Sequence, residues 1–333
     1  MRIGAISVLN EEYFHDEAAS FAMVESIVWA DGPVCPHCGG KDRIYTLAGI
    51  RSKPSKKNPQ GVVRHGLKKC GTCRKQFTVR IGTVFESSHI PLHYWLQAFH
   101  LLCSSKNGIS SHQLHRILGI KYQSAWFMSH RIREAMRTGS LAAPMGGDGS
   151  PSNVVEIDET YIGKKEGAVM KSGGSGHKRA VVTLVNRLGE ARSFHVDKAN
   201  KNNVMPIVRE NIAAEGVLFS DETRIYDDAG NEVMHHAKVN HFRHQYVNPA
   251  RTEFAPFDAI HTNTVEGYFS IFKRGMKGVY QHCAEKHLHR YLAEFDFRYS
   301  NRVKMGVDDK ERTIRALEGV KGKRLTYSRS SDA

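Results

Sequence analysis

Three carboxylates that are far apart in the sequence are candidates for binding a metal ion. Asp158 lies inside the apolar run VVEIDETYI, and Asp221 closes the apolar run GVLFSD. A carboxylate among apolar strand residues is costly unless it is paired or binds a metal ion. Glu266 follows later, in HTNTVEGYFSIFKRGMKG. Acids from separate elements that converge on two divalent cations support phosphoryl transfer, which is the chemistry that these residues predict. A solvated acid without a function is the alternative for each.

The segment that carries Glu266 predicts a helix with two different faces. Its apolar stripe consists of Val265, Phe269, Phe272 and Met276, and its polar stripe consists of Asn263, Glu266, Ser270, Lys273 and Lys277. Glu266 and Lys273 then lie on one face, roughly 10 Å apart along the axis. We expect Glu266 to bind the metal while Lys273 reaches a phosphate, with Lys277 as a further DNA contact. Asn263 is the rival oxygen ligand, and His261 is a candidate second-sphere donor. A solvated polar face is the alternative.

Four of the six cysteines form two C-x-x-C pairs. Cys35 and Cys38 lie in CPHCGG, and Cys70 and Cys73 lie in CGTCRKQF, with 31 residues between the pairs. Two such pairs supply the four thiolates of a tetrahedral zinc site. A redox C-x-x-C is the alternative, but no βαβ pattern surrounds either pair. The spacing therefore predicts structural Zn²⁺ in a zinc ribbon.

The stretch between the cysteine pairs is strongly basic. Residues 39–69 contain nine Lys and Arg residues and one acid, Asp42. Their Gly, Pro and Ser content predicts a long hairpin whose tip lies along DNA phosphates, with Lys56, Lys57 and Arg64 as candidate contacts. A solvated loop without DNA contact is the alternative.

Residues 92–137 predict a helical region. Apolar residues recur at steps of three and four from Trp95, and GISSHQLHRILGIKYQSAWFMSHRIREAM predicts a Ser cap, a short helix, a turn at Gly119 and a second helix. This is the layout of a helix-turn-helix, whose second helix enters a DNA groove. A helical hairpin that does not touch DNA is the alternative. The candidate DNA contacts are Lys121, Gln123 and Arg131.

Short β runs follow a linker rich in Gly and Pro. The runs VVEIDETYIG, RAVVTLV and ARSFHVD precede a predicted helix at 202–213 and the strand GVLFSDE. Three strands in series, a helix and another strand is the order of an RNase H-like α/β core. Helices follow from residue 261, and the chain after about residue 303 is polar and basic with no clear core face. The predicted organisation is an N-terminal segment and zinc ribbon at 1–84, a helix-turn-helix-like DNA-binding region at 85–138, a linker at 139–153, the catalytic core at 154–303 and a basic tail at 304–333.

The composition favours a globular protein with a polyanionic partner. The 333-residue chain has 40% hydrophobic residues and a formal net charge of +14. This charge favours nucleic acid over an anionic membrane surface. No apolar run approaches the roughly 18 residues of a membrane helix. Glu11 and Glu12 stand where a secretory signal would continue its apolar run. We therefore expect a cytosolic protein without a membrane partner.

The ordered combination of these motifs resembles the bacterial insertion-sequence transposases of the ISXO2-like group, in which a zinc ribbon precedes a DDE-type core. The resemblance rests on CPHCGG, KCGTCRKQFTVRIGTVFESS, VVEIDETYIG, VLFSDE, HTNTVEGYFSIFKRGMKGVY and HLHRYLAEFDFRYSNR, and it covers about residues 20 to 303. It implies that Asp158, Asp221 and Glu266 match the metal-binding acids of the family. Lys273 matches the lysine that follows the third acid. Some members resemble a pattern with asparagine as the third ligand, so Asn263 stays open beside Glu266.

The resemblance implies a DNA transposase. The ribbon and helical region would bind the terminal inverted repeats, and the core would use two Mg²⁺ or Mn²⁺ ions to cut DNA and join the freed end to target DNA. The segment HHAKVNHFRHQYVN also resembles the family and adds His241 as a candidate contact to DNA or phosphate. Synapsis of two ends implies a homodimer or larger assembly, in the bacterial cytoplasm and associated with the nucleoid. The alternatives are a zinc-ribbon regulator without catalysis and an RNase H-like nuclease.

Overall fold

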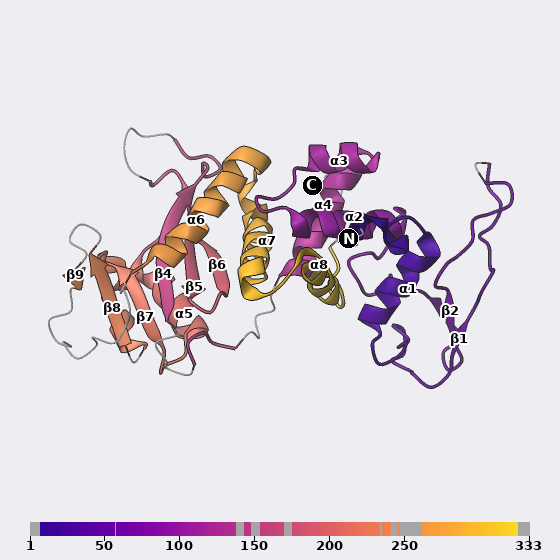
Figure 1. Cartoon of the computed structure of the whole chain (residues 1–333), viewed down its shortest axis with the longest axis horizontal. Helices are drawn as coiled ribbons and strands as arrows, with labels where there is room; N and C mark the ends of the chain where they lie inside the picture. Colours follow the sequence, from indigo (N-terminus) through magenta and orange to yellow (C-terminus); the bar gives the residue numbers. More distant parts are fainter. Residues whose placement is uncertain are drawn as a thin grey trace, which may run out of the picture. The chain divides into compact units, whose positions relative to one another are not determined.

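The chain divides into two compact units in a computed structural model (Figure 1). The structure describes residues 7–56, 58–137, 143–147, 154–169, 175–233, 235–240, 245–246 and 261–325. The first unit, called the ribbon unit here, consists of Met1–Ser105, Ile109–Met136 and Asp308–Ala333. The second, the sheet unit, consists of Lys106–Gly108 and Arg137–Val307. In sequence, the sheet unit is therefore inserted between two parts of the ribbon unit.

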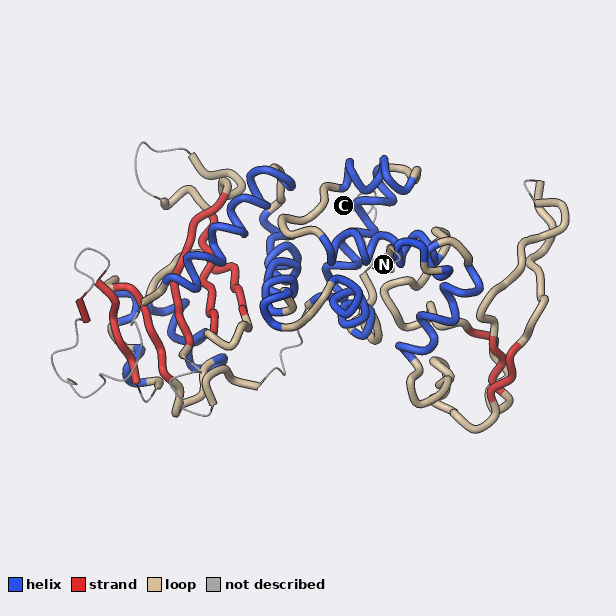
Figure 2. Tube along the Cα trace, in the orientation of Figure 1, coloured by secondary structure: helices blue, strands red, loops and turns tan. Residues whose placement is uncertain are grey.

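The ribbon unit begins with a capped helix and a small sheet. Two 3-10 turns, η1 (Val8–Asn10) and η2 (Glu12–Phe14), precede α1 (Glu17–Val28). The Asp16 carboxylate caps α1 by accepting a 2.7 Å hydrogen bond from the Ala19 amide. Strands β1 (Ile44–Thr46), β2 (Lys68–Cys70) and β3 (Gln76–Phe77) pair antiparallel in the order β1-β2-β3. Beyond β1 and β2 the two arms run on as a long loop (Figure 2), joined by a bridge between Arg51 and Val63.

Three helices follow in the ribbon unit, as the sequence predicts. They are α2 (Leu92–Ser104), α3 (Ser111–Leu118) and α4 (Tyr122–Met136). The Ser110 hydroxyl caps α3 by accepting a 3.1 Å hydrogen bond from the Gln113 amide. Gly119 ends α3 with a φ of 63°, a left-handed conformation that glycine adopts without strain. The α3–turn–α4 arrangement has the layout of a helix-turn-helix.

The expectation that the chain after residue 303 has no core face is wrong for helix α8 (Asp309–Glu318). Ala316 and Leu317 of this helix are 0% and 1% exposed. The helix packs against α2, and the Arg312 guanidinium donates a 2.8 Å hydrogen bond to the Cys103 carbonyl. The C-terminal segment up to residue 325 is therefore a structural part of the ribbon unit. The domain boundaries otherwise remain predictions.

The sheet unit is built on a six-stranded mixed sheet in the order β6-β5-β4-β7-β8-β9. Its strands are β4 (Val155–Ile162), β5 (Arg179–Asn186), β6 (Ala191–Val196), β7 (Val217–Asp221), β8 (His235–Asn240) and β9 (Gln245–Tyr246). β5 runs antiparallel to β4 and β6, while β7 runs parallel to β4 and to β8. Every residue of β5 is buried, because this strand lies inside the sheet with helices over both faces.

Helices cover the two faces of this sheet (Figure 1). α5 (Lys201–Asn211) and the turns η4 (Arg224–Tyr226) and η5 (Ala229–Asn231) form one apolar cluster with the sheet. α6 (Asn263–Gly275), its π-helical continuation η6 (Met276–Tyr280) and α7 (Leu288–Ser300) form the other cluster on the opposite face. Short turns η7 (Glu285–His287) and η8 (Val303–Met305) flank α7.

Among the described residues, no helix is both long enough and apolar enough to cross a bilayer.

Candidate active site and zinc centre

Asp158 and Asp221 stand on neighbouring parallel strands. β4 pairs with β7 in a register that places Glu156 opposite Phe219. Two residues further along each strand, the same register brings Asp158 opposite Asp221. Residues opposite one another on paired strands project from the same face of the sheet, and alternate residues share a face. The two acids therefore lie on one face, although their strands are distant in the sequence.

The face that carries the two acids is the one that α6 covers. Ile162 of β4 packs in the cluster formed with α6 and α7, whereas Ile157 packs in the cluster formed with α5. Asp158 has the parity of Ile162 and so shares the α6 face. Glu159 points to the opposite face, where its Oε2 accepts a 2.6 Å hydrogen bond from the Tyr226 hydroxyl.

The charges of both other predicted acids, Asp221 and Glu266, contribute to the pKa of Asp158. Burial, and then the negative charges of neighbouring carboxylates, raise the pKa of Asp158 to about 7. The contributing carboxylates are Glu159, Asp221 and Glu266. The Glu159 amide donates a 2.7 Å hydrogen bond to Asp158 Oδ1 and acts in the opposite direction. A cluster of acids that repel one another is relieved by a bound cation, so this arrangement is suited to a divalent metal.

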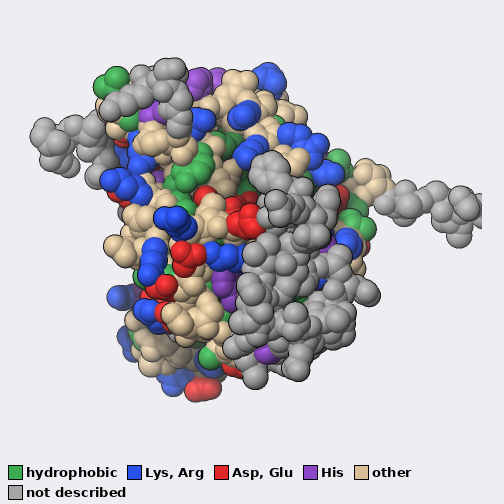
Figure 3. Space-filling view, turned by 90° about the vertical axis from the view of Figure 1, so that its left-hand side faces the viewer, with side chains coloured by type: hydrophobic (Ala, Val, Ile, Leu, Met, Phe, Trp, Pro, Cys, Tyr) green, Lys and Arg blue, Asp and Glu red, His purple; other side chains and the backbone are tan. Residues whose placement is uncertain are grey.

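The carboxylates are nevertheless less tightly gathered than a closed metal site. The described residues contain one group of three or more candidate ligands whose ligand atoms all lie within 4.8 Å of one another, and it consists of cysteines. Asp221 Oδ1 instead accepts hydrogen bonds from the Thr223 amide at 3.1 Å and the Thr223 hydroxyl at 2.7 Å. Figure 3 shows Asp and Glu side chains near the middle of one face of the molecule, with Lys and Arg side chains around them.

Helix α6 presents the two faces that its sequence predicts. Val265, Phe269, Phe272 and Met276 are all buried, with exposed fractions of 0% to 5%. Glu266 lies in the first turn and is exposed, and so is its rival Asn263, the first residue of the helix. Lys273 lies in the last turn with its ammonium group 5.8 Å from the centre of the Phe269 ring. Lys277 follows in η6 and is exposed.

Sequence reasoning missed the part played by Glu156. This residue is 0% exposed, and its carboxylate accepts hydrogen bonds from the Thr264 amide at 2.8 Å and the Val265 amide at 3.1 Å. His261, expected as a second-sphere donor, has its Nδ1 3.2 Å from Glu156 Oε1. The signal that could have identified Glu156 was a second acid in the same apolar strand.

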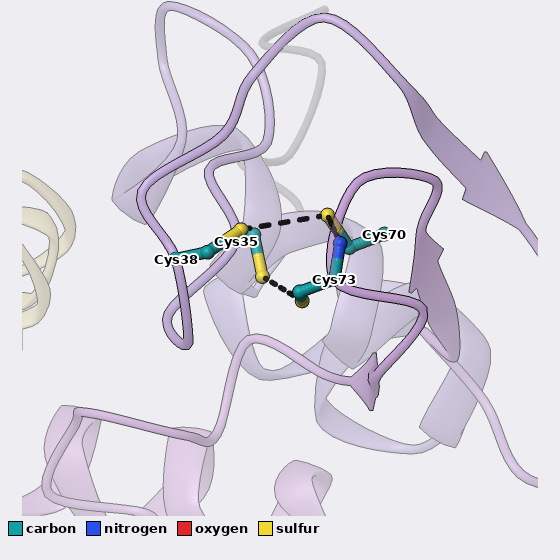
Figure 4. Close-up of side chains that lie close together, drawn as sticks. All are labelled: Cys35, Cys38, Cys70 and Cys73. Atoms are coloured by element: carbon teal, nitrogen blue, oxygen red, sulfur yellow. Dashed lines mark hydrogen bonds between the residues drawn. The ribbon is translucent and has the colours of Figure 1, made fainter.

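The four predicted zinc ligands come together in the ribbon unit (Figure 4). The Cys35 and Cys73 sulfurs are 3.6 Å apart, as are those of Cys38 and Cys70. Hydrogen bonding from the Cys73 amide lowers the pKa of Cys70 to about 6, which favours the thiolate. Four thiolates at this spacing fit tetrahedral Zn²⁺.

The two regions match known protein families. Residues 151–300 match the ISXO2-like transposase domain, and residues 15–76 match the transposase zinc-ribbon domain. Over these residues the chain is similar to the ISXO2-like insertion-sequence transposases and to their zinc ribbon. It is also 22% identical over 306 residues to an uncharacterized protein in transposable element ISH50 of Halobacterium salinarum, with 86% of this chain and 91% of that protein covered. The predicted family is thereby confirmed.

The zinc-ribbon match includes the predicted basic hairpin. Lys56 and Arg64 are exposed on it, and Arg64 donates a 3.3 Å hydrogen bond to the Gln76 side chain. Lys57, the third candidate on the hairpin, lies outside the described residues, as does His241 between β8 and β9. DNA contacts by these residues remain predictions.

The arrangement of α3 and α4 corrects one expected DNA contact. Lys121 and Gln123 are exposed at the start of α4. Arg131 is only 3% exposed, and its guanidinium donates 2.7 Å hydrogen bonds to the carbonyls of Val84 and Glu86. This arginine therefore fixes the loop before α2, which contains Val84 and Glu86, to α4 and does not face a DNA groove.

Proposed function

We propose that the chain is a DNA transposase that cuts the ends of its own element and joins them to target DNA with the help of Mg²⁺ or Mn²⁺. The observation that carries this proposal is the pairing of β4 with β7, which carry Asp158 and Asp221, together with a pKa of Asp158 that burial and the charges of Glu159, Asp221 and Glu266 raise to about 7. The charges of Asp221 and Glu266 thus act on Asp158 from a neighbouring strand and a helix. They lie within the segment that matches a transposase domain.

We further propose that the sheet unit is an RNase H-like core. Three consecutive strands, a helix and a fourth strand follow in the expected order as β4, β5, β6, α5 and β7. Of the strands β4 to β8, only β5 runs against the others, because β4, β7 and β8 are parallel and β6 pairs antiparallel with β5. This topology supports the proposal by placing Asp158 beside Asp221.

In this proposal Asp158, Asp221 and Glu266 hold the divalent ions, and Asn263 is the alternative third ligand. Carboxylate oxygens are the ligands that Mg²⁺ prefers. The ions would supply the activation of a water molecule and the neutralisation of charge on the phosphate. Lys273, on the helix that carries Glu266, would contact the scissile or a neighbouring phosphate. The protein contributes position and charge, so the reaction requires no covalent protein intermediate.

The ribbon unit is proposed to bind the terminal inverted repeats. The net charge of +14 and the exposed cations of the hairpin, Lys56 and Arg64, support attraction to phosphates. Lys121 and Gln123 at the start of α4, and Lys277 in the sheet unit, are further proposed contacts. Zn²⁺ at the four cysteines would be structural. Synapsis of two ends implies a homodimer or larger assembly on DNA, in the cytoplasm at the nucleoid.

The proposal is tested by incubating the purified protein with labelled DNA that carries the sequences flanking its own gene, in the presence of Mg²⁺ or Mn²⁺. We expect nicked and joined products, both lost in Asp158→Asn and Asp221→Asn while binding of the ends persists. Loss of a metal ligand removes several kcal/mol of transition-state stabilisation, which corresponds to about a thousandfold in rate. Cleavage without joining would favour a nuclease, and binding without metal-dependent cleavage would favour a regulator.

A further inference from the structure

Glu156 supplies the N-terminal cap of α6 from another element. Its carboxylate accepts from the Thr264 amide at 2.8 Å, the Thr264 hydroxyl at 2.7 Å and the Val265 amide at 3.1 Å. The N-cap residue of the helix, Thr262, makes no side-chain capping hydrogen bond. The first amides of a helix carry a partial positive charge, and a carboxylate that accepts from them is strongly held.

The buried carboxylate of Glu156 is compensated by an arginine and contacted by a histidine from other segments. Arg187 Nε lies 3.2 Å from Glu156 Oε1, and the Arg187 guanidinium also lies 5.2 Å from the centre of the Phe219 ring on β7. His261 Nδ1 lies 3.2 Å from the same carboxylate oxygen. A fully buried carboxylate is tolerated only with such partners. Glu156 therefore joins β4, the turn after β5 and the start of α6.

Glu156 connects the strand and the helix that carry two of the proposed metal ligands, Asp158 and Glu266. Asp158 follows on the same face of β4, roughly 7 Å further along the strand. Glu266 follows directly after Val265, whose amide Glu156 binds. One side chain thus fixes the helix turn that carries Glu266 to the strand that carries Asp158.

We propose that Glu156 is a positioning residue for the metal site, resting on the function proposed above. Its carboxylate sets the distance between Asp158 and Glu266 by holding the first turn of α6 against β4. It does not touch the metal or the DNA. Residues that orient metal ligands in this way contribute about 10-fold to 100-fold to metal affinity.

The test is the affinity of the full-length, zinc-loaded protein for Mn²⁺, followed by the electron paramagnetic resonance signal of free Mn²⁺. Binding that is lost in Asp158→Asn defines the carboxylate site. Glu156→Asp keeps the charge but shortens the side chain by one methylene, so that it no longer spans to the α6 amides. We expect Glu156→Asp to bind Mn²⁺ at least about tenfold more weakly than the unmodified protein.

The matched control is Glu294→Gln. Glu294 is also 0% exposed and also pairs with an arginine, Arg298, but it lies on α7. Both changes should lower the unfolding temperature, whereas only Glu156→Asp should weaken Mn²⁺ binding. Should Glu156→Asp fail to fold, Thr264→Val removes a single donor to Glu156 without a change of charge and should weaken Mn²⁺ binding several-fold.

Two results separate this inference from the proposed function. If Glu156→Asp, or Thr264→Val in its place, binds Mn²⁺ as tightly as the unmodified protein, Glu156 acts through charge or stability and the positioning role is wrong. If the unmodified protein itself shows neither Mn²⁺ binding that depends on Asp158 nor cleavage of DNA, the proposed function fails, and the positioning role fails with it.

Discussion

The zinc centre and the carboxylate site differ in how far the protein alone assembles them. The four cysteines come from one small sheet and its neighbouring turns, and their ligand atoms lie within 4.8 Å of one another. The three acids come from two strands and a helix, and burial, followed by the charges of Glu159, Asp221 and Glu266, raises the pKa of Asp158 to about 7. Thiols are mostly protonated near neutral pH and can pack together without a cation, whereas carboxylates are mostly ionised and repel one another unless a cation lies between them. The cysteine ligands are therefore already gathered in the protein, whereas the carboxylates carry negative charge that a bound cation would neutralise.

The largest effect that this comparison predicts is the loss of a zinc ligand. Cys35→Ser should remove bound zinc and unfold the ribbon, because structural zinc contributes roughly 10 kcal/mol of apparent binding free energy. Zinc content, measured colorimetrically, should fall while end binding is lost. Cys103→Ser is the matched control, since Cys103 is equally buried but lies outside the cluster. A Cys35→Ser protein that retains its zinc would contradict the assignment.

A smaller effect is expected at Asp296, a half-buried acid whose carboxylate accepts several hydrogen bonds. Its carboxylate accepts from the Ser193 hydroxyl at 2.7 Å and from the Tyr268 hydroxyl at 2.5 Å, yet burial raises its pKa to about 7. The folded protein then binds this proton more tightly than the unfolded chain, so stability falls as pH rises from about 4 to 7. In Asp296→Asn, the free energy of unfolding should fall by about 2 kcal/mol less between pH 5 and 8 than in the unmodified protein, as measured by urea unfolding. An unchanged pH dependence would refute this.

At the carboxylate site, removal of a ligand should stabilise the protein. Asp158→Asn relieves the repulsion from Asp221 and Glu266, so the unfolding temperature without divalent ions should rise by about 2 to 4 °C, or roughly 1 kcal/mol. Glu222→Gln, at an exposed acid beside Asp221, is the control and should leave it unchanged. A lower unfolding temperature for Asp158→Asn would show that this carboxylate, like the zinc ligands, stabilises the fold, and would contradict the prediction.

The smallest predicted effect concerns DNA binding by the ribbon unit. Lys121→Ala should weaken binding of the terminal repeats a few-fold and reduce the slope of log affinity against log salt by about one. Fluorescence anisotropy between about 50 and 200 mM salt measures both quantities. Lys310→Ala removes an exposed lysine of α8 and should change neither. Equal slopes for the two variants would exclude Lys121 as a phosphate contact.

Local patterns of the sequence predicted most of the elements that carry these sites. The apolar run VVEIDETYI placed Asp158 within a strand, which is β4, and the periodicity of α6 identified its buried stripe. The spacing of the cysteines was sufficient for their cluster because it is a local property. The metal ligands and DNA contacts themselves remain predictions, and the choice between Glu266 and Asn263 stays open because both are exposed.

Features that depend on distant partners escaped the sequence. Arg131 is a cation on a predicted DNA-binding helix, which favoured a DNA contact. Its hydrogen bonds to the carbonyls of Val84 and Glu86 cannot be predicted from the helix alone. Glu156 is informative only once its strand is known to meet the start of α6. The short α8 has few apolar residues, so its buried side became recognisable only against α2.

The return of α8 to the ribbon unit also orders events during synthesis. A ribosome makes α2 early, but α8, which packs against it, follows the entire sheet unit in the sequence. Domains generally fold as their residues emerge, so the helical part of the ribbon unit is completed only when nearly all of the chain has been translated. A product terminated within the sheet unit lacks the helix that covers α2. Under the function proposed above, we therefore expect truncated chains to bind the DNA ends of the element less well than the whole chain does.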